Sequence, residues 1–169
     1  MTEEEARSLI GAPSCEPILH FVKPDYIGVE IGAFLGTSSV RFLDNCKYMY
    51  FIDPFGPYPG YRGPVNDFIP VDAFFKTLKP YSKKQYTLFQ ELSSTAATKI
   101  PLVDFVYIDG NHDPDYVRMD LALYWPKVLN GGFLSGHDYG WAGHTIREFF
   151  DPMNYKIEVF QDCWVVKKP

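Results

Sequence analysis

The stretch DFVYIDGNHDPDYVRMDLALYWPKVLNGGFLSGHDY, residues 104–139, decides the fold of this 169-residue chain. It reads as strand, loop, helix, turn and strand. The apolar run Phe105–Ile108 stops at Asp109, and the run Gly132–Ser135 stops at Asp138. Between the two runs, apolar and aromatic residues recur at spacings of three and four, the period of a helix that buries one face: Val117, Leu121, Tyr124, Trp125 and Val128.

This pattern predicts one βαβ unit. Because its crossover is right-handed, the two strands lie parallel and their carboxyl ends open on one edge of the sheet. Open α/β sheets bind their ligands at that edge. Chain geometry alone therefore brings four polar side chains into one small region: Asp109, His112, His137 and Asp138.

The composition indicates one globular domain with a small-molecule partner. The chain is 46% hydrophobic and 17% aromatic, which excludes a disordered protein. Its net charge of -5 offers no basic surface to nucleic acid or to an anionic membrane. The start, MTEEEARSLI, is acidic where a signal peptide would be basic, and no long apolar run occurs. We therefore expect a cytoplasmic protein that binds neither nucleic acid nor membrane.

The elements outside the central stretch alternate in the same way. Residues 1–25 contain three prolines and a glycine and are expected to form a cap, and residues 26–169 the core of the same single domain. Three further strands are predicted in YIGVEIG (26–32), KYMYFIDPF (47–55) and QYTLFQ (85–90), with a helix after each. Thr37 or Ser38 is expected to cap the first of these helices.

The rest of the chain supplies a loop, a helix and a hairpin. The loop 56–70, GPYPGYRGPVNDFIP, is expected to form part of an acceptor pocket. A helix is predicted at 142–153, and YKIEVFQ and CWVVKKP form a hairpin that turns at Gln161 and Asp162. The fold class is therefore α/β: a Rossmann-like, seven-stranded, mostly parallel sheet with helices on both faces and a C-terminal antiparallel hairpin.

A glycine turn joins the first strand to its helix in the pattern E-I-G-x-x-x-G-T-S, with Glu30, Gly32 and Gly36 at its fixed positions. A nicotinamide-binding fingerprint requires G-x-G-x-x-G, which Ala33 and Phe34 do not supply. A cofactor without a pyrophosphate therefore fits better. The alternative is that the glycines only make a tight turn.

Asp53 ends the second strand, about twenty residues after the glycines, where an acid can accept both ribose hydroxyls of a nucleoside cofactor. Alternatively, Asp53 only forms a turn before Pro54. Together with the glycine turn, its position favours a nucleoside cofactor.

Four segments, GVEIGAFLGTSS, YFIDPF, the central stretch 104–139 and WAGHTIREFF, resemble the class I S-adenosylmethionine-dependent methyltransferases. More narrowly, they are similar to the methyltransferase-24 family, related to metal-dependent sugar O-methyltransferases of macrolide assembly. The resemblance covers about residues 26–153, and its most diagnostic parts are I-D-G-x-H and G-H-D-Y.

The resemblance implies that S-adenosyl-L-methionine is the cofactor. Glu30, Gly32 and Gly36 would surround its methionine part, Asp53 would hold the ribose, and the turn 90–94 would lie along the adenine. Here that turn reads only QELSS, which departs from the family's glycine-acid-serine pattern. The expected cofactor-binding residues are Glu30, Gly32, Gly36, Asp53, Gln90, Glu91, Ser93 and Asp109.

Asp109 and Asp138 are the candidate metal ligands. Close carboxylates repel each other unless a proton or a cation joins them, and the resemblance implies a divalent cation at these two positions. Oxygen ligands favour Mg²⁺, whereas participation of His137 would favour Mn²⁺ or another transition metal. Helix capping or backbone hydrogen bonding by the two carboxylates is the alternative.

His112 and His137 are the candidate catalytic bases. A neutral imidazole is suited to take a proton from an acceptor hydroxyl, and the resembling sugar methyltransferases have a histidine base at the position of His112. His137 is the reserve base or a metal ligand.

These features predict an S-adenosylmethionine-dependent methyltransferase, EC 2.1.1.-, that O-methylates a small hydroxylated acceptor, a sugar or similar, with divalent-metal assistance. Because the chain is short for the class and has little N-terminal lid, we expect the acceptor site either to be open or to be completed by a second subunit of a homo-oligomer. Two other classes remain: a non-catalytic S-adenosylmethionine-binding or scaffold protein of the same fold, and an NAD-dependent oxidoreductase.

Overall fold

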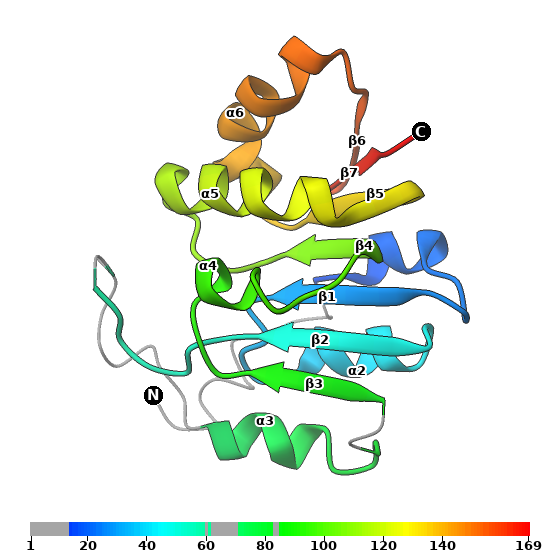
Figure 1. Cartoon of the computed structure of the whole chain (residues 1–169), viewed down its shortest axis with the longest axis vertical. Helices are drawn as coiled ribbons and strands as arrows, with labels where there is room; N and C mark the ends of the chain where they lie inside the picture. The colour runs from blue at the N-terminus through cyan, green and yellow to red at the C-terminus, as the bar shows by residue number, and fades with distance from the viewer. Residues whose placement is uncertain (1–13, 60, 62–70, 83–84) are drawn as a thin grey trace.

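The computed structural model describes residues 14–59, 61, 71–82 and 85–169. Over this part of the chain, seven strands form one sheet in the order β3-β2-β1-β4-β5-β7-β6 (Figure 1). β1 to β5 pair in parallel, whereas β7 lies antiparallel between β5 and β6. The predicted fold class is confirmed. The strands are β1 (Ile27–Ile31), β2 (Tyr48–Ile52), β3 (Tyr86–Phe89), β4 (Val103–Ile108), β5 (Val128–Gly136), β6 (Ile157–Phe160) and β7 (Cys163–Lys167).

Helices cover both faces of the sheet, because neighbouring residues of each central strand point to opposite sides. Val106 of β4 belongs to the core formed with α5 and α6, whereas Phe105 belongs to the core formed with η1, α2 and α3. Within the described residues, none of the helices is long and apolar enough to cross a membrane. The helices are η1 (Glu16–Phe21), α2 (Thr37–Leu43), α3 (Val71–Thr77), α4 (Ser93–Ala96), α5 (Pro114–Tyr124), η3 (Trp125–Lys127), α6 (Tyr139–Phe150) and η4 (Asp151–Met153).

The central unit has the predicted order, but two of its boundaries were wrong. Val128, which was expected on the helix, is the first residue of β5, so the strand begins four residues before Gly132. α5 ends at Tyr124 and continues as the 3-10 turn η3, which contains Pro126. Proline has no N–H to donate and its ring disfavours the preceding helical turn, so the α-helix cannot run on to Val128.

The predicted cap of α2 was also wrong. Gly36 is the N-cap residue, in a left-handed conformation with φ +77°, and no side chain caps the helix. The hydroxyls of Ser38 and Ser39 instead donate to the carboxylate of Glu30 beneath the helix. Their hydrogen bonds are used inside the core rather than at the helix end.

The described part of the N-terminal segment, residues 14–25, is anchored on the core by two of its side chains. Cys15 and Ile18 are fully buried and pack with residues of α2 and the sheet. Residues 1–13 of the predicted cap lie outside the described residues, as do 60 and 62–70 of the predicted acceptor loop.

Candidate active site

The carboxyl ends of β1, β2, β4 and β5 meet at one edge of the sheet, where the predicted polar residues follow the strands. The strands are held in register by backbone hydrogen bonds: the N–H of Asp109 donates to Ile31 at 2.8 Å, and that of His137 to Ile108 at 3.1 Å. Asp109 and His137 therefore leave neighbouring parallel strands at the same level. The structure confirms the convergence that the central stretch predicts.

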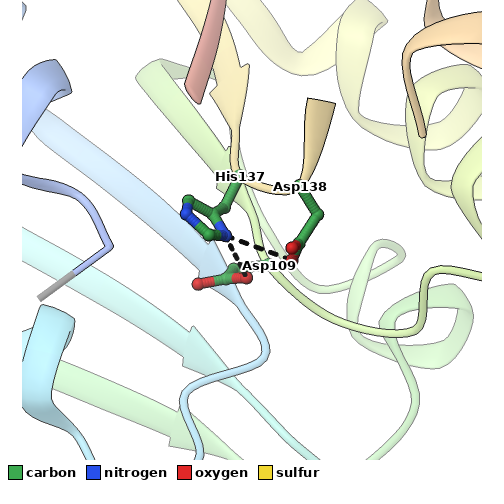
Figure 2. A group of neighbouring side chains, drawn as sticks. All are labelled: Asp109, His137 and Asp138. Atoms are coloured by element: carbon green, nitrogen blue, oxygen red, sulfur yellow. Dashed lines mark ion pairs between the residues drawn. The ribbon is translucent and has the colours of Figure 1, made fainter. Parts of the chain in front are cut away.

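Asp109, His137 and Asp138 form a compact group at this edge (Figure 2). The Nδ1 atom of His137 lies 3.1 Å from Oδ2 of Asp138 and 4.0 Å from Oδ1 of Asp109. Among the described residues, these three side chains offer one potential ligand atom each, and all three atoms lie within 4.8 Å of one another. Two carboxylate oxygens and an imidazole nitrogen suit a divalent cation.

His112 joins the group from the loop after β4. Its Nε2 atom lies 2.6 Å from Oδ2 of Asp138, so this carboxylate oxygen is shared by two histidines. Half of the His112 side chain is exposed, whereas only 19% of the Asp138 side chain is. The imidazole is therefore fixed by Asp138 and still accessible to a ligand.

The electrostatics of the group set the two carboxylates apart. Hydrogen bonds from His112 and then from His137 hold the pKa of Asp138 well below its usual range. Burial raises the pKa of Asp109, and its hydrogen bond from Ser14 acts in the opposite direction. The hydrogen bond to Asp138 raises the pKa of both histidines. Asp138 is thus the permanently charged member of the group.

Asp138 does not cap α6 with its side chain, so helix capping, one alternative to a metal-binding role, does not explain this residue. It is the N-cap residue, with φ +54°, but no side-chain cap hydrogen bond forms. A non-glycine residue in the left-handed region is uncommon. The carboxylate is used by the two histidines instead.

The glycine turn after β1 is required by backbone packing. Gly32 has φ +90°, and a Cβ atom there would collide with the carbonyl oxygen of Asp109. A Cβ on Gly36 would lie 2.6 Å from Cδ1 of Leu78. Both glycines therefore allow the chain to pass close to its neighbours at the edge where a ligand would lie.

Asp53 lies beside this turn with both carboxylate oxygens in use. Oδ2 accepts from the N–H of Phe34 at 2.9 Å, and Oδ1 from the N–H of Phe55 at 2.7 Å. Each oxygen has a second lone pair. The residue is thus held rigidly at the end of β2, and it keeps acceptor capacity for a pair of hydroxyls.

Glu30 lies inside the protein, beneath the glycine turn. It is fully buried and points to the face covered by α2, where Ser38 and Ser39 donate to it. Burial raises its pKa to about 8. A direct role toward a cofactor stays a prediction, and the structure gives Glu30 a role beneath the turn.

The turn 90–94, which was expected to lie along the adenine, contains both exposed and buried side chains. Gln90 is exposed and Glu91 pairs with Lys99 at 2.6 Å. Ser93, however, is buried and donates to Asp120 of α5 at 2.5 Å. The Ser93 hydroxyl is therefore used within the protein.

Other polar residues at the site were not predicted from the sequence. Ser14 donates to Asp109, and Asn111 donates to the hydroxyl of Tyr58 at 2.9 Å. The ring of Tyr58, a residue of the predicted acceptor loop, lies edge-on to that of Tyr116 on α5. Asn111 stands within the quoted I-D-G-N-H segment, which is a signal that could have found it, whereas Ser14 has none.

Trp141 is 82% exposed on the first turn of α6. It is therefore not a core residue.

The seven-stranded sheet has the fold of solved structures described as methyltransferases. The chain belongs to the methyltransferase-24 family, whose model, described as a methyltransferase domain, matches residues 29–139. No curated protein matches the chain in sequence.

Three solved structures illustrate the shared fold. A protein described as a methyltransferase from Streptococcus mutans, in complex with S-adenosylhomocysteine, matches with a TM-score of 0.70 at 12% identity, over 95% of this chain and 99% of that one. One described as a caffeoyl-CoA O-methyltransferase from Staphylococcus aureus gives 0.66 at 13% identity, over 99% and 92%.

The third is the MycE methyltransferase of the mycinamycin biosynthetic pathway, in complex with Mg and S-adenosylhomocysteine. It gives a TM-score of 0.61 at 14% identity, over 91% of this chain and 47% of MycE, so the chain spans about half of that protein. Proteins described as rRNA methylases also match. At these identities the likeness shows the fold, and the fold is shared by enzymes with different substrates.

Proposed function

We propose that this protein is an S-adenosylmethionine-dependent O-methyltransferase that acts on a small hydroxylated molecule, such as a sugar, with the help of a divalent cation. The observation that carries the proposal is the group formed by Asp109, His137 and Asp138, with His112 bonded to Asp138. The O-methyltransferase and the Mg-containing MycE among the structures of the same fold support it.

The residues at the edge fit the cofactor. Asp53 is held by two backbone amides with lone pairs left for ribose hydroxyls, and the turn at Gly32 lies at the same edge of the sheet. When bound, S-adenosylmethionine would supply the methyl group. The part of the chain around Asp53 and Gly32 would bind and orient it, since correct positioning is a large part of the rate in such displacements.

The same edge fits a divalent cation. Asp109 and Asp138 offer oxygens and His137 a nitrogen, a donor set compatible with Mg²⁺ and, because of the imidazole, well suited to Mn²⁺. Bound there, the cation would lower the pKa of an acceptor hydroxyl. For His137 to bind it, the imidazole must be neutral.

His112 is the proposed base. In its neutral form, Nε2–H donates to Asp138, which leaves the lone pair on Nδ1. Nδ1 would take the proton of the acceptor hydroxyl, and Asp138 would stabilise the imidazolium that results. His137, held between two carboxylates, fits a ligand better than a base.

Two measurements test this function. Calorimetric titration with S-adenosylhomocysteine and NADH separates the proposed cofactor from the nicotinamide alternative, and we expect binding of the first only. Methyl transfer to a panel of hydroxylated small molecules is then assayed after EDTA treatment and after addition of Mg²⁺ or Mn²⁺. Cofactor binding without turnover on any acceptor would favour a non-catalytic protein of the same fold. Full activity in EDTA would show that methyl transfer does not require a divalent cation.

The expectation of a small molecule rather than nucleic acid rests on the net charge of -5. Because rRNA methylases share the fold, the panel includes an unmodified rRNA transcript. Methylation of that transcript would contradict the proposed substrate class while leaving the cofactor unchanged.

A further inference from the structure

Ser14 lies at the candidate metal centre although it precedes the first strand. Its Oγ donates to Oδ2 of Asp109 at 2.7 Å, and the hydroxyl of Tyr107 donates to Oγ of Ser14 at 3.0 Å. A serine hydroxyl has one proton, so Ser14 gives it to the carboxylate and accepts from the tyrosine. Tyr107, Ser14 and Asp109 thus form a chain of hydrogen bonds that all point toward Asp109.

The two donors in this chain of hydrogen bonds, Tyr107 and Ser14, are both held in place by the surrounding protein. Tyr107 is fully buried on β4, with its ring centroid 5.1 Å from that of Phe42. Ser14 is followed by the fully buried Cys15, and its carbonyl accepts a hydrogen bond from the thiol of Cys163 at 3.0 Å. The Ser14 hydroxyl is therefore presented to Asp109 from a fixed position.

The consequence for Asp109 is that its two oxygens become different. Oδ2 is held by Ser14, whereas Oδ1 is the oxygen that lies 4.0 Å from Nδ1 of His137, on the side of the candidate centre. Without Ser14 the carboxylate could rotate and exchange its oxygens. Hydrogen bonds from neighbouring groups commonly orient metal-binding carboxylates in this way.

We propose that Ser14, supported by Tyr107, is a positioning residue that fixes Asp109 as a ligand through one oxygen, Oδ1, for a divalent cation. The inference rests on the proposed metal-assisted function and adds to it a residue from the N-terminal segment. Ser14 acts only through Asp109 and makes no contact with the acceptor in this scheme.

The test is the affinity of the full chain for Mn²⁺, measured by calorimetry without cofactor or acceptor. Loss of a residue that orients a ligand typically weakens metal binding by about 10- to 100-fold, and we expect Ser14→Ala to fall in that range. Ser14→Thr keeps the hydroxyl and should remain close to the wild type. Tyr107→Phe removes only the hydroxyl that fixes Ser14, so its decrease in Mn²⁺ affinity should be measurable but smaller than that of Ser14→Ala.

Ser135→Ala is the control, because Ser135 is a buried serine whose hydroxyl donates to the carbonyl of Val106 at 3.0 Å and not to Asp109. Its Mn²⁺ affinity should equal that of the wild type, and thermal melting confirms that each variant is folded. Wild-type affinity in both Ser14→Ala and Tyr107→Phe would overturn the inference and leave the proposed function intact. A wild-type protein that binds no Mn²⁺ would overturn both the inference and the proposed cation, and methyl transfer in EDTA would then show a metal-free enzyme.

Discussion

Nε2 of His112 and Oδ2 of Asp138 lie 2.6 Å apart, so a charge-assisted hydrogen bond ties the loop after β4 to the loop after β5. The pairing gives His112 a fixed orientation and leaves Nδ1 as its free nitrogen. His137 differs in that its Nδ1 atom lies between Asp138 and Asp109, at 3.1 Å and 4.0 Å from their nearest carboxylate oxygens.

His112→Ala should reduce turnover by about 10²- to 10⁴-fold, the usual contribution of a general base. Affinity for S-adenosylhomocysteine should persist, because His112 lies away from Asp53 and the glycine turn in the proposed scheme. His144→Ala is the control, since His144 is an exposed histidine that pairs with Glu148. If His137→Ala lost turnover with unchanged Mn²⁺ affinity while His112→Ala stayed active, the roles of the two histidines would be reversed.

Asp53→Ala should weaken binding of S-adenosylhomocysteine by about 1–3 kcal/mol, the cost of losing a charged hydrogen-bond acceptor. Calorimetry measures the change, and circular dichroism checks that the turn after β2 is still folded despite the loss of its bonds to Phe34 and Phe55. Asp25→Ala, at an exposed position before β1, should bind normally. A folded Asp53→Ala protein with wild-type affinity would remove Asp53 from the cofactor site.

Gly32→Ala should destabilise the fold more than Gly131→Ala. Both glycines have positive φ, +90° and +83°, so both variants carry the backbone strain of about 1–3 kcal/mol. Only at Gly32 would the new Cβ also collide with the carbonyl of Asp109, whereas Gly131 has nothing within 4 Å. Urea unfolding of the two variants measures how much stability the collision costs beyond the backbone strain. Equal losses of unfolding free energy would show that the turn can move away from Asp109.

Glu30 should make the stability of the protein fall as pH rises. Burial raises its pKa from the ordinary 4.5 to about 8, so between these values the folded state holds a proton that the unfolded state releases. The stabilisation is complete below pH 4.5 and is lost as pH rises through 8. Glu30→Gln cannot ionise and should therefore gain stability relative to the wild type between pH 5 and pH 9.

Urea unfolding at several pH values measures this gain. Glu16→Gln is the control for the substitution itself, because Glu16 is exposed and pairs with Arg41 at the surface. A constant difference between Glu30→Gln and the wild type would mean that the buried carboxylate is not protonated in the folded state.

The sequence predicts the parts of the site that depend on strand ends. Asp109 and Asp138 could be placed together because each follows an apolar run, and a right-handed crossover brings such ends to one edge. The end of α5 could not be placed so well, since Val128 fits both the helical period and a strand, and only the turn at Pro126 separates the two.

Side-chain directions and distant partners were beyond the sequence patterns. Glu30 follows the first strand's alternation into the α2 face, where Ser38 and Ser39 are available to it, and Ser93 finds Asp120 on another helix. Ser14 is 95 residues from Asp109, and no period or motif connects them. Such contacts depend on tertiary packing, which local patterns do not encode.

The antiparallel strand β7 lies between β5 and β6, and its hydrogen bonds to β5 run up to Gly136, the residue before His137. During synthesis on the ribosome, β5 therefore emerges when β4 is its only neighbouring strand. Its other edge can form backbone hydrogen bonds only after β7, Cys163–Lys167, has been synthesised. The turn before β7 also holds the start of α6, because Asp162 accepts from the N–H of Tyr139 and of Gly140. In a nascent chain, the glycine turn and Asp53 are thus synthesised well before the segment that fixes the positions of His137 and Asp138.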